Sequence, residues 1–243
     1  MSVNDSPSHS IEAQRVREAY ATELRMTRAM LYAWHRPEIG WTTYRMRAVA
    51  AKLIYSHFGA SGPRSMLEIG CGTAPWVRTA ADWGFAIGAW NGIDLLPDRI
   101  ATARQICPGG ANLLVGNGMA LPFEDNSIDL VVASTVFSSI LDRSVRMSVA
   151  SEAWRVLRPG GAAMIFDFRI KDPRNPDTVA IGRSELVRLF PASRPAVRSL
   201  ILVPPLARRL ASASLPLVAM LEWGVPWLRS HLMTLFIKDP GPV

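Results

Sequence analysis

The chain has 243 residues, a hydrophobic content of 49% and a formal net charge of +7. That length suits one α/β domain with extensions, and the apolar content is ample for a core. Two cysteines, Cys71 and Cys107, are too few for a disulfide framework, so we expect a reducing, cytoplasmic setting. The first residues lack the pattern of a signal peptide, and no uncharged apolar run reaches the roughly 18 residues of a membrane-spanning helix.

Basic residues concentrate at the two ends of the chain. There are nine basic and five acidic residues before position 66, and eleven basic and five acidic residues after position 168. Such flanks can attract nucleic acid, anionic membrane or a phosphorylated substrate, and a solvated arginine-rich surface explains them equally well. Because no basic cluster is interleaved with aromatic residues, the pattern disfavours nucleic acid as a partner.

The first sixty residues predict a helical cap. Apolar residues recur at helical spacing from Ile11, and a second helix is predicted over about 41–58, before the breaker segment 59–63. Short apolar strands then alternate with helices, which predicts a parallel sheet covered on both faces. We expect strands near 65–69, 89–94, 112–116, 128–134 and 161–168, and helices near 75–82, 97–106 and 144–157.

The pattern changes after Asp167. A polar, proline-interrupted loop leads to a short helix near 184–189 and to strands near 197–203 and 232–237. The apolar, proline-rich segment between those strands, about 204–231, is interpreted as an inserted helical lid. The predicted organisation is a cap over 1–60 and a main domain over 61–243.

The most informative segment is 66–75, where an apolar strand runs into a glycine pair and then opens a helix. Asp94 ends the next predicted strand, 22 positions after Gly72. Glycines let backbone approach a ligand, a helix start offers free N–H groups, and a carboxylate about 20 residues on can bind a ribose diol. The sequence therefore predicts a nucleoside-binding cleft at the carboxyl edge of the sheet.

Two residues disfavour a dinucleotide in this cleft. Pro75 stands where the dinucleotide fingerprint needs a small residue for close helix–strand packing. Glu68 precedes the glycines, and an acidic group there suits an amino group or a sulfonium better than a pyrophosphate.

Four segments resemble, in order, the motifs of class I S-adenosylmethionine-dependent methyltransferases: 68–73, 92–95, 121–130 and 156–161. The likeness covers roughly 65–170 and is closest to the small-molecule branch that includes quinone and sterol methyltransferases. It implies a Rossmann-like, doubly wound seven-stranded sheet, mostly parallel with an antiparallel last strand. It also implies S-adenosyl-L-methionine as the cofactor. The alternative to a methyltransferase is a domain with a nucleotide-binding fold that has no catalytic activity.

The resemblance implies a set of cofactor contacts that runs through the loops after the first four strands. Ala74 stands where many relatives carry a third glycine, and Asn117 stands where relatives place an aspartate that accepts from the adenine amino group. Asp94 is expected to bind the ribose, and Ser134 and Thr135 to lie by the methionine carboxylate. The predicted cofactor-binding residues are Glu68, Gly70, Cys71, Gly72, Thr73, Asp94, Leu95, Arg99, Asn117, Gly118, Met119, Ser134 and Thr135.

Candidates for catalysis are His35, because related enzymes fold such N-terminal segments over the pocket, and Asp167 at the end of the fifth strand. A packing or surface role for His35 stays open. Residues expected at the acceptor side are Tyr32, Trp34, Phe137, Ser138, Ser139, Arg169 and Arg174. The histidines lack ligand spacing with each other or with cysteine, so no metal site is predicted.

Three functions remain open from the sequence. The leading one is methyl transfer to a hydroxyl or amine of a small molecule such as a glycan or secondary metabolite. The second is a lipid-linked acceptor at a membrane surface, with Trp223 and Trp227 of the insertion at the interface. The third is a cofactor-binding domain without catalysis. No signature of amino-group nucleic-acid methylases follows the fourth strand, and RNA methylation rests on the basic flanks alone.

Overall fold

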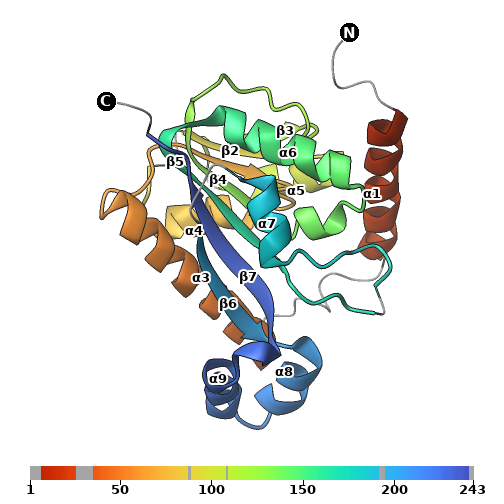
Figure 1. Ribbon diagram of the computed structural model, residues 1–243, viewed down its shortest axis with the longest axis vertical. Helices are drawn as coiled ribbons and strands as arrows, with labels where there is room; N and C mark the ends of the chain where they lie inside the picture. The colour runs from red at the N-terminus through yellow and green to blue at the C-terminus, as the bar shows by residue number, and fades with distance from the viewer. Residues whose placement is uncertain are drawn as a thin grey trace.

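The computed structural model describes residues 7–25, 35–86, 89–107, 109–173, 175–191 and 195–240. Its centre is a seven-stranded sheet in the order β3-β2-β1-β4-β5-β7-β6 (Figure 1). Strands β1 to β5 pair in parallel, and β7 lies antiparallel between β5 and β6, which confirms the predicted fold. The strands are β1 (Met66–Ile69), β2 (Trp90–Asp94), β3 (Asn112–Val115), β4 (Ile128–Ser134), β5 (Leu157–Phe168), β6 (Ala196–Leu202) and β7 (Arg229–Ile237).

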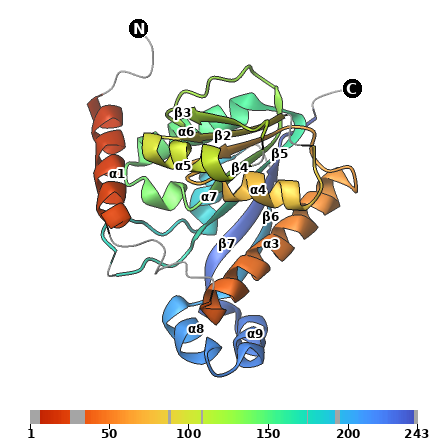
Figure 2. The same ribbon diagram turned by 180° about the vertical axis from the view of Figure 1, so that it is seen from behind.

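Helices cover both faces of the sheet, as Figures 1 and 2 show from opposite sides. One face packs against α3, α4 and α5, and the other against α6, α7 and the short helix η2. Apolar residues therefore form one core on each side of the sheet, and a smaller cluster lies around Leu202, Ala207, Ala211 and Val218. The helices are α1 (Pro7–Arg25), α3 (Pro37–Phe58), α4 (Pro75–Asp82), α5 (Pro97–Ile106), η2 (Phe137–Ser139), α6 (Arg143–Val156) and α7 (Arg183–Leu189).

Local sequence explains where several helices begin. Prolines open α3, α4 and α5, where a missing N–H costs no hydrogen bond. Asp142 caps α6, because its carboxylate accepts from the N–H groups of Ser144 and Val145. Helix α3 begins at Pro37, earlier than predicted, for the same reason.

The strand order reverses around β1, because the chain moves from β1 to β2 and β3 on one side and to β4 on the other. In open α/β sheets, the crevice outside the carboxyl ends of the strands at such a reversal is where ligands bind. The loops after β1 and β4 flank this crevice.

The insertion between β6 and β7 forms two helices and a short turn, α8 (Pro204–Ala211), α9 (Leu215–Gly224) and η3 (Pro226–Leu228). Strand β7 begins at Arg229, three residues before the predicted start, because Arg229 and His231 pair with Leu202 and Leu200 of β6. The insertion is therefore shorter than predicted. It projects beyond one end of the sheet (Figure 1).

A buried carboxylate fastens the insertion to α3. Glu222 of α9 is fully buried and accepts from Trp41 Nε1 and from Arg45 Nε, each at 2.9 Å. A buried charge with two charge-assisted or polar donors is a stable arrangement, and loss of either partner is costly. Within the described part of the chain, no helix has both the length and the apolar content that crossing a bilayer requires.

Candidate functional site

A cavity of about 850 Å³ lies at the carboxyl edge of the sheet, at the reversal of strand order. Helices α1, α3 and α8 and strand β6 complete its walls. The structure brings every residue of the predicted cofactor set to this one cavity. Those residues are Glu68, Gly70, Cys71, Gly72, Thr73, Asp94, Leu95, Arg99, Asn117, Gly118, Met119, Ser134 and Thr135.

The turn after β1 is built from residues in left-handed backbone conformation. Gly70 and Gly72 have φ of 61° and 55°, and Ala74 follows with 51°. A Cβ on Gly70 would lie 2.7 Å from Val136 Cγ2, so this position requires glycine. A Cβ on Gly72 would meet only Arg99 Nη1, at 3.8 Å, so a side chain there would occupy open cavity instead. The missing side chain leaves backbone accessible to a ligand.

Asp94 links the loop after β1 to the loop after β2 by hydrogen bonds. One carboxylate oxygen accepts from Gly72 N–H at 2.8 Å and the other from Leu96 N–H at 2.9 Å. Each oxygen retains a further lone pair, so the carboxylate can also accept from ribose hydroxyls. The 22-residue spacing between Gly72 and Asp94 therefore corresponds to a direct hydrogen bond between the two residues.

Glu68 accepts hydrogen bonds from the first turn of α4. Its Oε2 accepts from the N–H groups of Trp76 and Val77, both at 3.2 Å. Burial raises the pKa of Glu68 to about 8, although those two hydrogen bonds act in the opposite direction. The side chain lines the cavity, and its hydrogen bonds hold the turn to the helix.

The loops after β3 and β4 are also held by local hydrogen bonds. Asn117 Oδ1 accepts from Met119 N–H at 3.1 Å. Thr135 has φ of 56°, and its N–H donates to Phe166 O at 2.7 Å. Left-handed conformation in a β-branched residue costs about 1–3 kcal/mol and occurs where surrounding structure enforces it, commonly at ligand sites.

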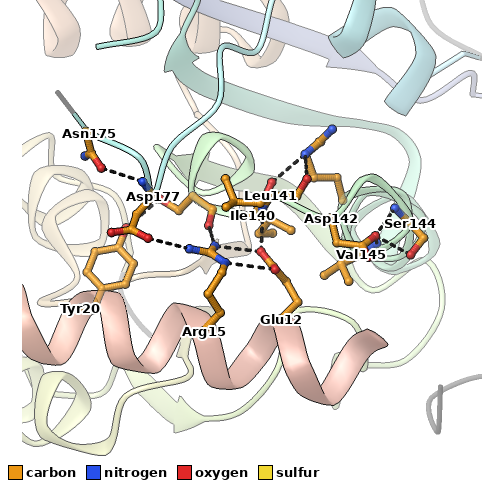
Figure 3. A network of polar contacts seen from close by, with 12 residues as sticks. Glu12, Arg15, Tyr20, Ile140, Leu141, Asp142, Ser144, Val145, Asn175 and Asp177 are labelled. Atoms are coloured by element: carbon orange, nitrogen blue, oxygen red, sulfur yellow. Dashed lines mark hydrogen bonds and ion pairs between the residues drawn. The ribbon is translucent and has the colours of Figure 1, made fainter. Parts of the chain in front are cut away.

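Helix α1 lies across the mouth of the cavity and is held by a polar network (Figure 3). Glu12 Oε1 accepts from Leu141 N–H at 2.6 Å, and Arg15 donates to Glu12, to Ser139 O and to Asp177. Burial would raise the pKa of Glu12, but its hydrogen bonds to Arg15 and Leu141 hold it below its ordinary value. The network closes the cavity from the α1 side.

Tyr20 extends this closure toward the cofactor residues. Its hydroxyl lies 2.8 Å from Ser139 Oγ, and the Arg99 guanidinium lies 4.2 Å from the centre of its ring. Sequence periodicity predicts the helix but not these partners, because they lie 79 and 119 residues further along the chain. Glu12, Arg15 and Tyr20 were therefore not predicted as site residues.

Two buried donors on α4 fit the carboxylate of the expected cofactor. Trp76 Nε1 and Arg78 Nε are buried, and neither has a hydrogen-bond partner among the described residues. Both side chains line the cavity. Unpaired buried donors are costly, and a carboxylate is the acceptor that best satisfies them. Together with Asp94 and the glycine turn, these groups suit S-adenosylmethionine.

The predicted catalytic and acceptor residues are mostly elsewhere. His35 is exposed in the turn before α3 and does not line the cavity. Asp167 is fully buried behind the wall and accepts from the N–H groups of Ser138 and Phe168; burial raises its pKa to about 6. Neither arrangement gives the side chain access to a ligand in this cavity.

Of the three predicted residues after β4, Ser139 lines the cavity, whereas Phe137 and Ser138 are buried outside it. Arg169 also lies outside and donates to Trp227 O at 3.3 Å. The remaining predicted acceptor residues, Tyr32, Trp34 and Arg174, fall outside the described residues.

The far end of the cavity is formed by segments from both ends of the chain. Apolar side chains and one imidazole form the part of its wall that we call the apolar compartment, and the charged residues Arg36, Glu38, Arg47 and Arg208 line the cavity beside it. A signal for that imidazole was present, since alternation in a strand puts His231 on the same inward face as the core residues Met233 and Leu235. The lining residues here are Thr42, Met46, Phe166, Phe168, Ile201, Leu202, Ala207 and His231.

Comparisons with known proteins agree with this geometry. Residues 67–165 match the family described as methyltransferase domain. The chain is 33% identical over 105 residues to demethylmenaquinone methyltransferase of Bacillus pumilus, across 42% of this chain and 44% of that protein. It is 29% identical over 178 residues to 2-methyl-6-phytyl-1,4-hydroquinone methyltransferase of Synechocystis, across 71% and 53%. The chain thus spans about half the length of these relatives.

A solved structure gives the same picture of the fold. A SAM-dependent methyltransferase from Archaeoglobus fulgidus has a TM-score of 0.58 to this chain at 14% identity, across 79% of this chain and 94% of that one. At that identity the likeness concerns the fold alone. The family match and the sequence relatives confirm the predicted resemblance and its cofactor.

Proposed function

We propose that this chain is an S-adenosylmethionine-dependent methyltransferase of small-molecule type that methylates a hydroquinone-type acceptor with an apolar tail. The proposal is supported by the methyltransferase-domain match over residues 67–165 and by the two quinone-type methyltransferases among its sequence relatives. The observation that carries the proposal is one continuous cavity. It joins Asp94 and the glycine turn at one end to an apolar compartment at the other.

The apolar compartment favours a tailed aromatic acceptor over a glycan. Phe166, Phe168 and Met46 offer ring and thioether surface, and the polar groups nearby come from α3 and α8. Apolar walls with a few polar groups are typical of sites for small hydrophobic ligands. Arg169, which was expected at the acceptor side, lies outside the cavity and so gives no support to a glycan acceptor.

The sequence relatives point the same way. Two are methyltransferases whose names specify a demethylmenaquinone and a phytyl hydroquinone. Both names describe a quinone-type ring, and the second includes an apolar phytyl chain. We extend that acceptor class to this chain.

In the proposed reaction the bound cofactor supplies an electrophilic methyl group. Asp94, the glycine turn and the α4 donors hold the cofactor at one end, and the apolar compartment aligns the acceptor ring at the other. Alignment of two bound reactants contributes a large part of such rate enhancements. Helix α1, held by Glu12 and Arg15, excludes water from the cavity.

The test is transfer of labelled methyl from S-adenosylmethionine to a panel of acceptors. We expect label in reduced demethylmenaquinone or a phytyl hydroquinone, less in the tail-less hydroquinone, and none in a sugar nucleotide. Cofactor binding by calorimetry is measured in parallel. Tight cofactor binding with no label in either tailed hydroquinone would contradict the proposal and favour a non-catalytic domain.

A second candidate, which places the same chemistry at an anionic membrane surface, is favoured by the insertion. The side chains of Met220, Trp223 and Trp227 are 63%, 65% and 72% exposed, which is unusual for residues of this size. Arg208 and Arg209 are exposed on α8, and Arg208 also lines the cavity. Exposed indoles beside arginines suit a bilayer interface with acidic headgroups.

Vesicle co-sedimentation distinguishes this candidate from a freely diffusing acceptor. We expect binding to vesicles that contain phosphatidylglycerol and roughly tenfold weaker binding after Trp223→Ser with Trp227→Ser. Met147→Ser is the matched control, because Met147 is 54% exposed on α6, away from the insertion (Figure 1). Equal binding of both variants, or no binding by the unchanged protein, would remove the membrane candidate.

A further inference from the structure

His231 is held in the wall of the apolar compartment by two aromatic rings. Its imidazole is 6% exposed, lines the cavity, and stacks on Phe166 with a centroid distance of 4.9 Å and an interplanar angle of 6°. Phe168 lies against it at 4.3 Å. The ring is therefore oriented by packing and is in contact with the space that a bound acceptor would fill.

The Ser230 hydroxyl links the imidazole of His231 to the backbone of β6. Its oxygen lies 3.1 Å from Ile201 O and 2.8 Å from His231 Nδ1. A serine has one hydroxyl proton, so in the arrangement that makes both hydrogen bonds Ser230 donates to Ile201 O and accepts from Nδ1–H. In the neutral ring Nε2 then has a free lone pair, and no described residue donates to it.

The backbone that supports this arrangement is strained. Ile201 has φ of 66°. The ladder between β6 and β7 pairs Leu200 with His231 and Leu202 with Arg229 but skips Ile201. A β-branched residue in this conformation costs about 1–3 kcal/mol and persists where surrounding structure enforces it. The irregularity places the Ile201 carbonyl on the Ser230 hydroxyl, and Ile201 itself lines the cavity.

We propose that His231 is the general base of the acceptor site, with Ser230 as its positioning residue. Nε2 takes the proton of an acceptor hydroxyl: the O–H bond breaks, its electron pair stays on oxygen, and an N–H bond forms on the imidazole. The phenolate is then the nucleophile: a bond forms from its oxygen or ring carbon to the methyl group as the methyl–sulfur bond breaks and its electron pair stays on sulfur. If carbon attacks, its proton moves to the phenolate oxygen as the ring becomes aromatic again, and in either case the imidazolium releases its proton to solvent after product leaves. This role rests on the proposed hydroquinone acceptor, since a hydroxyl must be present.

The protonation state of the ring agrees with this role. Burial lowers the pKa of His231 from 6.5 to about 4, so the ring is neutral at physiological pH, and the same burial makes it a weaker base than a free imidazole until an anion lies beside it. A phenolate formed beside the ring would stabilise the imidazolium and promote transfer. The charged groups that line the cavity on the neighbouring α3 and α8 are Arg36, Glu38, Arg47 and Arg208.

The test compares His231→Gln with the control His57→Gln. His57 lies on α3, bonds to Gly160 O and does not line the cavity. We expect His231→Gln to lower kcat roughly 100-fold, within the usual range for a general base, while the cofactor Kd stays unchanged. The lost rate should recover as pH rises, because the acceptor hydroxyl then ionises without a base. If glutamine disturbs folding, His231→Phe keeps the ring stack and removes Nε2.

Nitrogen NMR of the imidazole gives a readout independent of activity. We expect hydrogen on Nδ1 in the unchanged protein and a mixture of tautomers in Ser230→Ala, with kcat about tenfold lower and KM unchanged. Hydrogen on Nε2 in the unchanged protein, or the same rate and pH profile in His231→Gln, would overturn this role alone. Failure of the unchanged protein to methylate any hydroquinone would instead overturn the proposed function and this role together.

Discussion

The two ends of the cavity are built in different ways. At the cofactor end, the ligand-facing groups come from loops that directly follow β1, β2, β3 and β4, and backbone hydrogen bonds hold them. At the acceptor end, the walls come from α3 near the start of the chain, from the end of β5, and from β6, α8 and β7 near the end of the chain. One end depends on turn chemistry and the other on which side chains tertiary packing brings together.

This difference has a consequence for substitutions. A change in a cofactor loop breaks defined hydrogen bonds, so its effect should be large and specific to the cofactor. A change that loosens α1 should weaken closure of the cavity, with a smaller effect that is less specific to the cofactor. The following predictions separate the two ends, beginning with the largest expected effect.

Asp94→Ala should weaken cofactor binding by about 100-fold or more, because charge-assisted hydrogen bonds are each worth about 1.5–3 kcal/mol and the variant loses several. Gly72 N–H and Leu96 N–H would also lose their acceptor. Isothermal titration calorimetry with S-adenosylmethionine measures the change, and Asp98→Ala, exposed at the start of α5, is the control. Unchanged affinity in Asp94→Ala would contradict the ribose assignment.

Gly72→Val should reduce cofactor affinity roughly tenfold while the protein remains folded. The backbone φ of 55° is strained for a β-branched residue by about 1–3 kcal/mol, and the side chain would enter the cavity. Calorimetry and thermal unfolding are compared with Gly40→Val, since Gly40 has open space around its Cβ. Cofactor affinity equal to that of the control would show that the turn is not against the ligand.

Arg15→Ala should speed cofactor release about fivefold, because removing one hydrogen-bonding group from a surface closure costs about 1 kcal/mol. The change removes the Arg15 hydrogen bonds to Ser139 O and Asp177 and leaves the cofactor loops intact. Stopped-flow dissociation provides the rate, with Arg17→Ala, exposed on the same helix, as the control. If both variants release the cofactor at the original rate, α1 is not a closing element.

Glu68→Gln should leave cofactor affinity nearly unchanged but alter the pH dependence of stability. The pKa of Glu68 is about 8 in the folded protein, against an ordinary 4.5, so the folded state binds more protons between those values. The free energy of unfolding contributed by this group therefore falls as pH rises through that window. Glutamine cannot titrate, so urea unfolding of the variant should lack this decline. An identical pH profile in both proteins would contradict the raised pKa.

Much of the cofactor end could be predicted from the sequence. Alternating strands and helices predicted the parallel sheet, and the glycine turn with Asp94 22 positions later predicted the cleft. These inferences succeed because each loop lies beside its own strand, and parallel strands put their carboxyl ends at one edge. Near neighbours in sequence thus determine geometry there.

The residues of the acceptor end were harder to predict from the sequence, and Asp167 is an example. Phe166 and Phe168 line the cavity, so alternation along β5 turns Asp167 to the opposite face, toward Ser138. Alternation alone could not say which face of the strand the cavity occupies. His35 lies outside the cavity for a different reason, since the helix that follows it begins at Pro37 and leaves it in an exposed turn.

The amino-acid sequence by itself determined the order of strands and helices, the glycine turn and the carboxylate that faces it, because local hydrogen bonding and periodicity specify each of them. Only the tertiary structure decided that Tyr20 and Ser139 meet, that Glu222 fastens α9 to Trp41, and that His231 faces the acceptor compartment. Those contacts join segments distant in the chain, and their geometry depends on how whole helices and strands pack.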